Sequence, residues 1–464
     1  MKSLKLKDIL VHLKGELLQG NENLLIKNVE TKAAKVNNYT LLFAFRQTKS
    51  AGLKPSNAIV TKNPLFWRKN KNLTIIKVKD IKKAYWDFVR YYRDLFDIPV
   101  IGVTGTCGKT TTTEMIKTIL SGKYKVHATS VGKNALFRNL PYLLGLDDET
   151  QAAIFELGVT HPGNITNSCQ HFQPQTGVLL NIGTYHLKGC KTLANYIKAK
   201  GELVDGIKPD GTLILNADDE NIKQIDLSSF LGRIVYFGFG RQAHYRAKNV
   251  RSAKGGMEFT LGYQNKSYPF FVPGYGEHNV YNALAAIAAT HTTGIDFKEV
   301  RARLATFSQV GQHLQLKPGL KGCTIIDDTW NCTPPSMEAA LKVLKLLKGK
   351  LFRHKSVAVL GYMPQLGASA MDEYRKIGDK VVSTGVDVLI TLGEEAKQIG
   401  DSALARGFAK DKLFNCHTAA ELFNVVERIA DKHTLMLFKF PYKYRLSKDP
   451  SYRKFIVDIY STFM

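Results

Sequence analysis

Residues 103–110 have the composition of a loop that binds phosphate. They read Val103-Thr104-Gly105-Thr106-Cys107-Gly108-Lys109-Thr110, between an apolar strand and a predicted helix over residues 111–120. In such a loop small residues let backbone N–H groups approach phosphate, the lysine neutralises the β- and γ-phosphate oxygens, and the threonine hydroxyl can bind Mg²⁺. The general Walker pattern requires glycine where Val103 stands, so the match misses by one position. A tight strand-to-helix turn without a ligand is the alternative, and the flanking strand and helix favour the nucleotide site.

The elements that would position this loop form an α/β pattern that begins at Ile98. Short apolar strands alternate with helices, and the strands are predicted over residues 99–103, 152–155, 177–180 and 212–215. Such alternation is typical of a mostly parallel sheet with helices on both faces. Residues 245–272 depart from the pattern, since Gly255-Gly256 and Gln264-Asn265 are turn signals between alternating segments. We expect antiparallel hairpins there, followed by a helix over residues 277–290.

The two flanking regions also have α/β character. Residues 1–97 are predicted to form a small α/β domain, with a helix near residues 6–18, short strands and an amphipathic segment over residues 81–96. A third run of alternation has strands over residues 324–326, 356–360, 387–390 and 434–438, which is typical of a Rossmann-like domain. The expected architecture is three domains: a small α/β domain at 1–97, a central P-loop ATPase-like domain at 98–312 and a Rossmann-like domain at 313–464.

Bulk properties narrow the class of protein. The chain has 464 residues and a formal net charge of +25, which favours anionic partners such as nucleotides or phosphorylated intermediates. Basic runs such as residues 67–71 are explained by solvated lysine faces, so we do not expect a nucleic-acid partner. No stretch of eighteen apolar residues occurs, and the six cysteines contain no C-x-x-C pair. We expect a cytoplasmic monomer with reduced thiols and no membrane span.

The phosphate loop and the segments that follow it resemble the Mur ligase family. The loop Thr104-Gly105-Thr106-x-Gly108-Lys109-Thr110 is similar to the family's compact version, which also lacks the earlier glycine, and Cys107 stands where Asn or Lys is usual. Four later segments of the same sheet resemble the family in the same order: Phe155-Glu156-Leu157-Gly158 with His161-Pro162-Gly163, Asn181-Ile182-Gly183-Thr184-Tyr185-His186-Leu187, Ile197-Lys198-Ala199-Lys200-Gly201-Glu202, and Gly276-Glu277-His278-Asn279-Val280-Tyr281-Asn282.

The last predicted domain carries the resemblance further. Residues 326–337 read Ile-Asp-Asp-Thr-Trp-Asn-Cys-Thr-Pro-Pro-Ser-Met, which resembles the Asp-Asp-Ser-Tyr-Asn-Ala-Asn-Pro-x-Ser-Met of the branch that adds D-alanyl-D-alanine to a UDP-muramoyl-tripeptide. Residues 358–367 are similar to that branch's Ala-Val-Leu-Gly-Asp-Met-x-Glu-Leu-Gly. The resemblance therefore extends over about residues 98–395.

The resemblance implies a role for each matching residue. Catalytic roles fall to Lys109, to His186 and to Lys200, which matches a lysine that the family carbamylates to make an anionic metal ligand. Thr110, Glu156 and His186 would bind Mg²⁺. The residues expected to hold ATP are Gly105, Thr106, Cys107, Gly108, Lys109, Thr110, Thr111, Asn279, Asn282 and Asp328. Taken alone, His186 is an ordinary polar residue, Lys200 a solvated helix lysine and the two asparagines part of a helix cap.

Departures from the family motifs cluster at positions expected to face substrate. Glu30-Thr31-Lys32 stands in place of an Asp-Ser-Arg element that helps to hold the UDP sugar, and Gln312 replaces an arginine expected to stabilise the transferring phosphate. In the last domain Tyr362 and Gln365 replace Asp and Glu, and Phe440-Pro441-Tyr442 follows Lys439 where the branch has Gly-Ser-Arg.

The resulting hypothesis is an ATP-dependent carboxylate–amine ligase that works through an acyl phosphate. ATP and Mg²⁺ are its expected cofactors, and a carboxylate donor and an amine acceptor, small molecules or peptides, are its expected substrates. Three alternatives stay open at this point: a paralogue with substrates outside peptidoglycan synthesis, an ATP-binding regulatory protein, and a pseudoenzyme that binds Mg-ATP without forming ADP.

Overall fold

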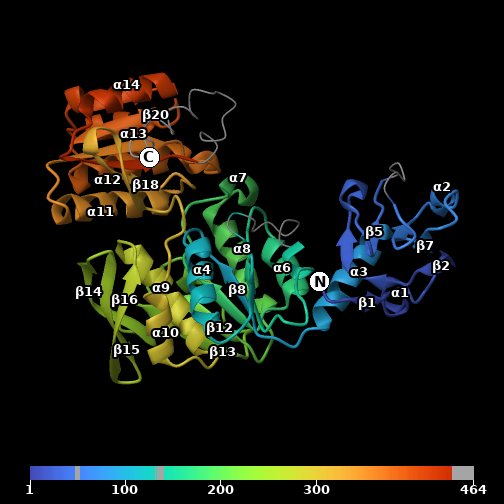
Figure 1. Cartoon of the computed structure of the whole chain (residues 1–464). Helices are drawn as coiled ribbons and strands as arrows, with labels where there is room; N and C mark the ends of the chain where they lie inside the picture. The colour runs from blue at the N-terminus through green and yellow to red at the C-terminus, as the bar shows by residue number, and fades with distance from the viewer. Residues whose placement is uncertain (47–52, 131, 133–140, 442–464) are drawn as a thin grey trace. The chain divides into compact units, whose positions relative to one another are not determined.

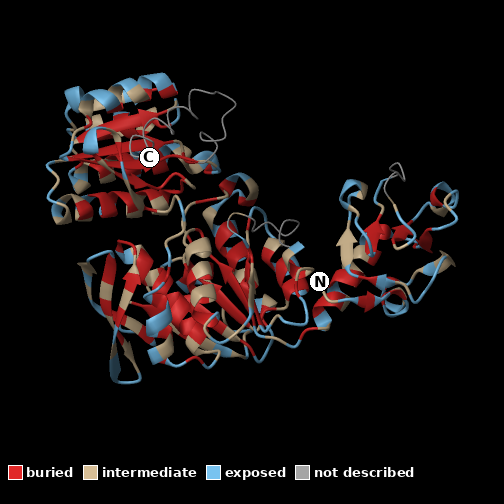
Figure 2. Ribbon diagram, viewed as in Figure 1, coloured by how far each residue is buried: buried red, intermediate tan, exposed pale blue. Residues whose placement is uncertain are grey.

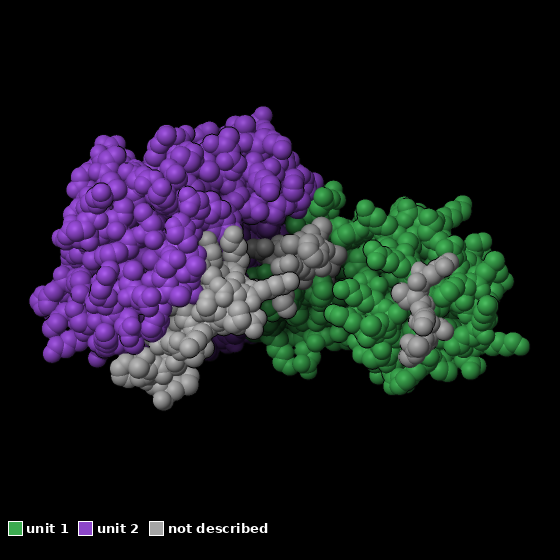
Figure 3. All heavy atoms as spheres, turned by 90° about the horizontal axis from the view of Figure 1, so that it is seen from above, with its two compact units in different colours: residues 1–100, 124–155, 167–173 green, residues 101–123, 156–166, 174–464 purple. Residues whose placement is uncertain are grey.

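A computed structural model describes residues 1–46, 53–130, 132 and 141–441 of the chain. The chain divides into two compact units (Figure 3): the first comprises residues 1–100, 124–155 and 167–173, and the second comprises residues 101–123, 156–166 and 174–464. Every candidate site residue lies in the second unit.

The N-terminal part of the first unit contains a five-stranded sheet with the order β2-β7-β6-β5-β4. Strands β4 to β7 pair in parallel in chain order, and β2 pairs with β7 antiparallel. The elements are β1 (Leu4–Lys5), α1 (Leu6–Leu13), β2 (Glu16–Gln19), β3 (Leu25–Ile26), β4 (Asn28–Glu30), η1 (Ala33–Lys35), β5 (Thr40–Phe43), β6 (Ala58–Thr61), α2 (Pro64–Trp67), β7 (Thr74–Lys77) and α3 (Ile81–Asp94).

One helix of this region is shorter than expected. The predicted helix over residues 6–18 ends at Leu13, because Lys14 adopts a left-handed conformation with φ 49° and Glu16–Gln19 then forms β2. The apolar residues at 17 and 18 therefore belong to a strand. The helix was predicted too long because the amphipathic pattern continues from the helix through the turn into this strand. The predicted segment over residues 81–96 is confirmed as α3, which Asp80 caps by accepting hydrogen bonds from two backbone N–H groups.

The phosphate loop belongs to a nine-stranded sheet with the order β16-β15-β14-β13-β12-β11-β8-β10-β9. Strand β8 pairs in parallel with β11, and β11, β12 and β13 continue in parallel. Its strands are β8 (Val100–Thr104), β9 (Val126–Ala128), β10 (Ala152–Glu156), β11 (Thr176–Leu179), β12 (Thr212–Asn216), β13 (Arg233–Gly238), β14 (Tyr245–Ala253), β15 (Gly256–Tyr263) and β16 (Lys266–Pro273). The predicted hairpins are confirmed, since β14, β15 and β16 pair antiparallel in sequence.

Helices cover this sheet and bury its central strands (Figures 1 and 2). They are α4 (Lys109–Leu120), α6 (Asn164–Phe172), α7 (Leu187–Cys190), α8 (Leu193–Gly206), η2 (Ile222–Gln224), α9 (Glu277–His291) and α10 (Phe297–Leu304). Helix α4 packs against α9, and α8 packs on β11. At that contact Gly177 leaves room for Leu203 and Ile207, because a Cβ at Gly177 would lie 2.7 Å from Ile207 Cδ1.

The C-terminal part of the second unit is built on a six-stranded sheet with the order β17-β18-β22-β19-β20-β21. Among the described pairings of this sheet, only the edge pair β17–β18 is antiparallel. Its elements are β17 (Gln315–Pro318), η3 (Leu320–Gly322), β18 (Thr324–Asp327), α11 (Pro334–Lys350), β19 (Lys355–Gly361), η4 (Gly367–Ser369), α12 (Ala370–Thr384), β20 (Val388–Leu392), α13 (Lys397–Ala405), η5 (Lys410–Lys412), β21 (Leu413–Cys416), α14 (Ala419–Ile429) and β22 (Thr434–Lys439).

The expected fold class is confirmed: a mostly parallel central sheet carries added antiparallel hairpins, and a smaller α/β region lies on either side of it in the sequence. The boundaries at 97/98 and 312/313 stay predictions. Over the described part of the chain, no helix has both the length and the apolar character that crossing a membrane requires.

Candidate active site

The phosphate loop connects β8 to α4 and is shaped by a glycine that no other residue could replace without strain. Gly108 caps α4 with φ 82°, in the left-handed region that favours glycine. A Cβ at this position would also lie 2.3 Å from the Asn282 side-chain oxygen. The loop backbone and α9 therefore approach closely, which brings Asn282, one of the residues predicted to hold ATP, against the loop.

Asn181, just after the end of β11, braces the loop from the neighbouring strand. Its side-chain oxygen accepts a hydrogen bond from the Cys107 backbone N–H at 2.9 Å, and its amide donates to the Cys107 carbonyl at 3.1 Å. Its own carbonyl accepts from the Thr106 N–H at 2.9 Å. The backbone of residues 106 and 107 is thus held by one asparagine, with a fixed geometry that suits phosphate binding.

Two lysines meet at the start of the loop. Lys109 Nζ donates to the Gly105 carbonyl at 2.8 Å and to the Thr106 carbonyl at 3.2 Å. Lys200 Nζ, from α8, donates to Thr104 Oγ1 at 2.8 Å and to the same Gly105 carbonyl at 3.1 Å. Two ammonium groups on one carbonyl oxygen repel each other, so proton loss from one of them stabilises the arrangement.

The pKa directions indicate which lysine loses its proton more readily. Lys200 is only 1% exposed, and burial, followed by the charge of Lys109, holds its pKa well below the ordinary lysine value. Burial also lowers the pKa of Lys109, but the Glu156 carboxylate opposes that effect. Lys200 is therefore the better candidate for a neutral, nucleophilic amine at physiological pH.

Glu156 and His186 follow the two strands that flank β8 in the sheet. Glu156 is fully buried at the end of β10 and influences Lys109 electrostatically. His186 lies between β11 and α7 with φ 54°, and its Nδ1 is buried without a hydrogen-bond partner among the described residues. Burial, with the charges of Lys109 and Lys200, lowers the pKa of His186 to about 3, so the imidazole is neutral and able to donate a lone pair.

The remaining predicted residues are placed as follows. Thr110 and Thr111 lie in the first turn of α4, and Thr106 Oγ1 accepts a hydrogen bond from the Gly183 N–H at 2.9 Å. Asn279 is buried and donates to the carbonyls of Pro273 and Gly274, at 2.7 and 3.1 Å. It therefore supports the turn before α9.

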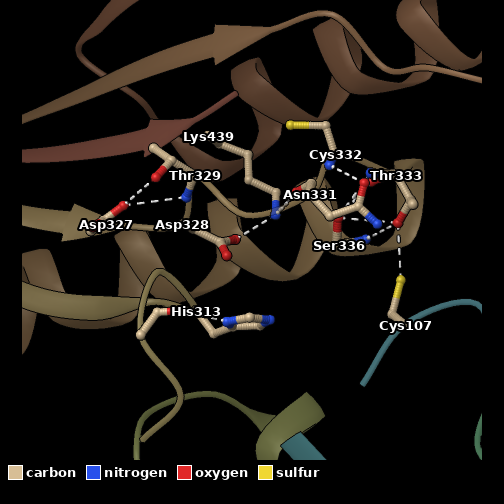
Figure 4. A network of polar contacts seen from close by, with 11 residues as sticks. Cys107, His313, Asp327, Asp328, Thr329, Asn331, Cys332, Thr333, Ser336 and Lys439 are labelled. Atoms are coloured by element: carbon tan, nitrogen blue, oxygen red, sulfur yellow. Dashed lines mark hydrogen bonds and ion pairs between the residues drawn. The ribbon is translucent and has the colours of Figure 1, made fainter. Parts of the chain in front are cut away.

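Asp328 lies in a polar network of the C-terminal region (Figure 4). Its carboxylate forms a 2.6 Å ion pair with Lys439, which also donates to the Asn331 carbonyl at 2.7 Å. Burial lowers the pKa of Lys439, but Asp328, together with Cys332 and Cys107, more than offsets this, so the pKa lies above its ordinary value. Cys107 of the phosphate loop joins the network through Thr333, at 2.9 Å between Sγ and Oγ1.

Two departures from the family motifs lie beside this network. Gln312 has φ 64°, and its buried side-chain oxygen has no hydrogen-bond partner among the described residues. Burial lowers the pKa of the neighbouring His313, and its neutral ring stacks near Trp330 with 5.9 Å between the ring centroids. His313 therefore does not replace the charge of an arginine at 312. Phe440 and Pro441 follow β22, and Tyr442 lies outside the described residues.

Sequence reasoning missed three residues that organise the site. Asn181 was part of a motif but had no assigned role, the Tyr196 hydroxyl lies 3.3 Å from Thr106 Oγ1, and Glu202 binds the start of α6. The Glu202 carboxylate accepts from the backbone N–H groups of Gly163, Ile165 and Thr166 at 2.5, 3.1 and 3.0 Å. The available signal was that all three lie close in sequence to residues with predicted functions.

Among the described residues, no group of three or more His, Cys, Asp or Glu side chains is arranged to hold a metal ion. Any metal bound beside Glu156 and His186 would therefore need further oxygen ligands from other groups, such as a threonine hydroxyl, a modified lysine, substrate phosphate or water.

Comparison with known proteins identifies the family. Residues 103–290 match the Mur ligase middle domain, and residues 314–439 match the Mur ligase glutamate ligase domain. The UDP-N-acetylmuramoyl-tripeptide–D-alanyl-D-alanine ligase of Bacillus subtilis is 31% identical over 369 residues, which are 79% of this chain and 78% of that protein. The chain belongs to the Mur ligase family.

Solved structures of Mur ligases share the fold. A crystal structure of MurF from Acinetobacter baumannii superposes with a TM-score of 0.83 at 24% identity, covering 98% of each chain. The MurF ligase of Thermotoga maritima, solved in complex with ADP, superposes with a TM-score of 0.75 at 20% identity and covers 92% of this chain and 96% of its own. The three-domain Mur ligase fold thus extends over nearly the whole chain, including the N-terminal region that carries the altered motif.

Proposed function

We propose that this Mur ligase joins D-alanyl-D-alanine to the terminal carboxylate of UDP-N-acetylmuramoyl-tripeptide, with conversion of ATP to ADP and phosphate. The observation that carries the proposal is the arrangement around one phosphate loop of buried Lys200 and Glu156 with half-buried Lys109 and His186. The Bacillus subtilis and Haemophilus influenzae proteins that bear this ligase name are 31% and 29% identical to the chain.

The chemistry begins with attack of the substrate carboxylate oxygen on the γ-phosphorus of ATP. The bond between the γ-phosphorus and the β,γ-bridging oxygen breaks, ADP leaves, and an acyl phosphate forms. The amine nitrogen of D-alanyl-D-alanine then attacks the acyl carbon, the proton on nitrogen is lost to a base, and phosphate leaves with one of the original carboxylate oxygens. The product is an amide.

The phosphate loop performs the binding step. Asn181 holds the backbone of residues 106 and 107 in place, and the backbone N–H groups of residues 108–110 would donate to the phosphates. Lys109 would move its ammonium from the Gly105 carbonyl to the β- and γ-phosphate oxygens. Since that ammonium is poorly solvated, its interaction with the anionic phosphates is strong. Thr111, Asn279, Asn282 and Asp328 complete the ATP site that we propose.

Mg²⁺ fits the donor set around this loop. Thr110 would hold one ion with the phosphates, and Glu156 and His186 would hold a second, which suits the buried carboxylate and the buried Nδ1 atom of His186. When bound, the ions would screen the phosphate charge and make the γ-phosphorus more electrophilic. Lys200 would supply an additional carboxylate oxygen if its neutral amine reacted with CO₂ to form a carbamate.

We further propose that the domains divide the work as their sequence boundaries suggest. Residues 1–97 would bind the UDP-sugar end of the donor, residues 98–312 ATP, and residues 313–464 the amine. Closure of the last domain would exclude water, which otherwise hydrolyses an acyl phosphate. All six cysteines are unpaired with one another, which agrees with a reducing cytoplasm, and we propose that the protein is a monomer there.

The test is product formation by the purified protein. Mg-ATP, bicarbonate, UDP-N-acetylmuramoyl-tripeptide and D-alanyl-D-alanine are combined, and ADP is measured together with the muramoyl-pentapeptide by mass spectrometry. Matched reactions omit one substrate at a time. We expect pentapeptide and ADP in equal amounts, only in the complete mixture. ADP without amide would instead indicate an ATPase, and an amide from another donor or acceptor would indicate a ligase with different substrates.

A further inference from the structure

Two positions at which this chain departs from the family motifs touch each other. Cys107 stands in the phosphate loop where Asn or Lys is usual, and Thr333 stands where the branch motif has its second asparagine. Although 226 positions separate them in the sequence, Cys107 Sγ lies 2.9 Å from Thr333 Oγ1 (Figure 4). The two altered positions therefore meet in one direct contact between the phosphate loop and the start of α11.

Each end of the contact is held rigidly. Asn181 fixes both the N–H and the carbonyl of Cys107. Thr333 is 1% exposed and caps α11, because its Oγ1 accepts from the Ser336 N–H at 3.3 Å and Ser336 Oγ accepts from the Thr333 N–H at 3.0 Å. This reciprocal capping box fixes the first turn of the helix. A displacement of the loop is therefore transmitted to α11 instead of being absorbed by a flexible side chain.

Further contacts hold residues 331–335 against the loop that carries His186. The Tyr185 hydroxyl donates to Asn331 Oδ1 at 3.3 Å, next to His186. Gly183 has no space for a side chain, because a Cβ there would lie 2.3 Å from Pro335 Cγ. Lys439 holds the other side of the segment through the Asn331 carbonyl. Residues 331–335 thus form a seated segment that touches both the phosphate loop and the loop that carries His186.

We propose that Cys107 and Thr333 are positioning residues that couple occupancy of the phosphate loop to the seating of residues 331–335. The inference rests on the proposed function in one respect, that the loop binds ATP. Because such a coupling is reciprocal, nucleotide favours the seated segment and the seated segment favours nucleotide. The thiol and hydroxyl act through the loop and the helix, and neither reacts with substrate.

A cysteine cross-link measures the seated state without requiring turnover. Thr333→Cys is made in a Cys332→Ala background and oxidised with diamide, and the disulfide between Cys107 and the introduced cysteine is quantified by peptide mass spectrometry. We expect this disulfide to form about tenfold faster with Mg²⁺ and a non-hydrolysable ATP analogue than without nucleotide. The same protein with Cys107→Ala controls for pairing with other cysteines. An equal rate with and without analogue, in protein that binds the analogue, overturns the proposal, and so does the absence of this disulfide in folded protein.

A matched pair of variants tests the effect on the reaction. Cys107→Ser keeps a hydroxyl within reach of Thr333, whereas Cys107→Ala removes the contact and leaves the α11 cap intact. We expect the alanine variant to raise the KM for ATP about tenfold and the serine variant to raise it no more than about threefold. Equal effects of the two substitutions contradict the proposal. If no ligase activity exists at all, the cross-linking result still decides the coupling, so failure of the proposed function is recognised separately.

Discussion

The phosphate loop and the altered Glu30-Thr31-Lys32 segment differ in how firmly the surrounding structure holds them. In the loop, Lys109, Thr106 and Cys107 each have polar contacts with other residues, and Asn181 fixes the backbone. In the first unit, Thr31 and Lys32 are exposed beyond the end of β4. A change in the loop disturbs several buried contacts, whereas a change at 31 or 32 disturbs few.

This difference sets the cost of a substitution in each region. Buried polar groups that lose a partner destabilise a protein by about 1–3 kcal/mol, so a change that leaves such a group of the loop unpaired is costly. Exposed residues outside such networks usually change stability by less than about 0.5 kcal/mol. Lys109, Thr110, Glu156, His186 and Lys200 match the family motifs, whereas Thr31 and Lys32 differ from them where a substitution costs little. The buried region has also changed, at Cys107, Gln312 and Thr333.

Replacement of Lys109 in the phosphate loop should have the largest effect on activity. Lys109→Ala should lower kcat for ADP formation by about a thousandfold, since it removes the cation proposed to bind the β- and γ-phosphate oxygens. Steady-state kinetics with a coupled ADP assay measures the loss. Lys117→Ala, at a half-exposed position of α4 two turns from the loop, is the matched control and should retain activity. Equal activity of the two variants would show that the loop does not perform the chemistry.

Loss of the carbamate at Lys200 should have the next largest effect on kcat. Lys200→Ala should lower kcat about a hundredfold, and short carboxylic acids such as formate should restore part of it. In the protein that retains Lys200, removal of CO₂ should lower activity, and bicarbonate should restore it. Carbamate formation requires the unprotonated amine, whose fraction rises with pH. Because the pKa of Lys200 is lowered, this dependence should occur at lower pH than for an exposed lysine. Activity that is indifferent to CO₂ and to bicarbonate would exclude the carbamate.

An arginine at position 312, where the family motif has one, should raise kcat. Gln312→Arg should raise kcat up to about tenfold, because Gln312 and the neutral His313 supply no positive charge near the transferring phosphate. Gln312→Lys separates the effect of charge from that of the planar guanidinium. Steady-state kinetics of both variants measures the change. A decrease with both substitutions, in folded protein, would mean that the site has adapted to a neutral residue.

The exposed segment should give the smallest effect. Replacing Glu30-Thr31-Lys32 by Asp-Ser-Arg should lower the KM for UDP-N-acetylmuramoyl-tripeptide about three- to tenfold and leave kcat nearly unchanged. The thermal midpoint should shift by no more than about 2 °C, since Thr31 and Lys32 are exposed and Glu30 is only half-buried. A large loss of stability would contradict the contrast between the two regions.

Much of this organisation was predictable from the sequence because it depends on local patterns. The strand–loop–helix around Lys109, the hairpins at 245–272 and the strands of both later sheets follow from apolar alternation and turn residues. The end of α1 was not predictable in the same way, because its amphipathic pattern continues through the turn at Lys14 into β2. The roles of Asn181 and Thr333 depend on contacts between distant segments, which no local pattern specifies.

Attack of a carboxylate on the γ-phosphorus of ATP is tested most directly by oxygen tracing. UDP-N-acetylmuramoyl-tripeptide labelled with ¹⁸O in its terminal carboxylate is converted with D-alanyl-D-alanine in unlabelled water, and the released phosphate is analysed by mass spectrometry. We expect one ¹⁸O atom in each phosphate, because the attacking oxygen leaves with the phosphoryl group. Phosphate without ¹⁸O, released together with ADP, would contradict attack by the carboxylate, since the attacking oxygen would then have come from water.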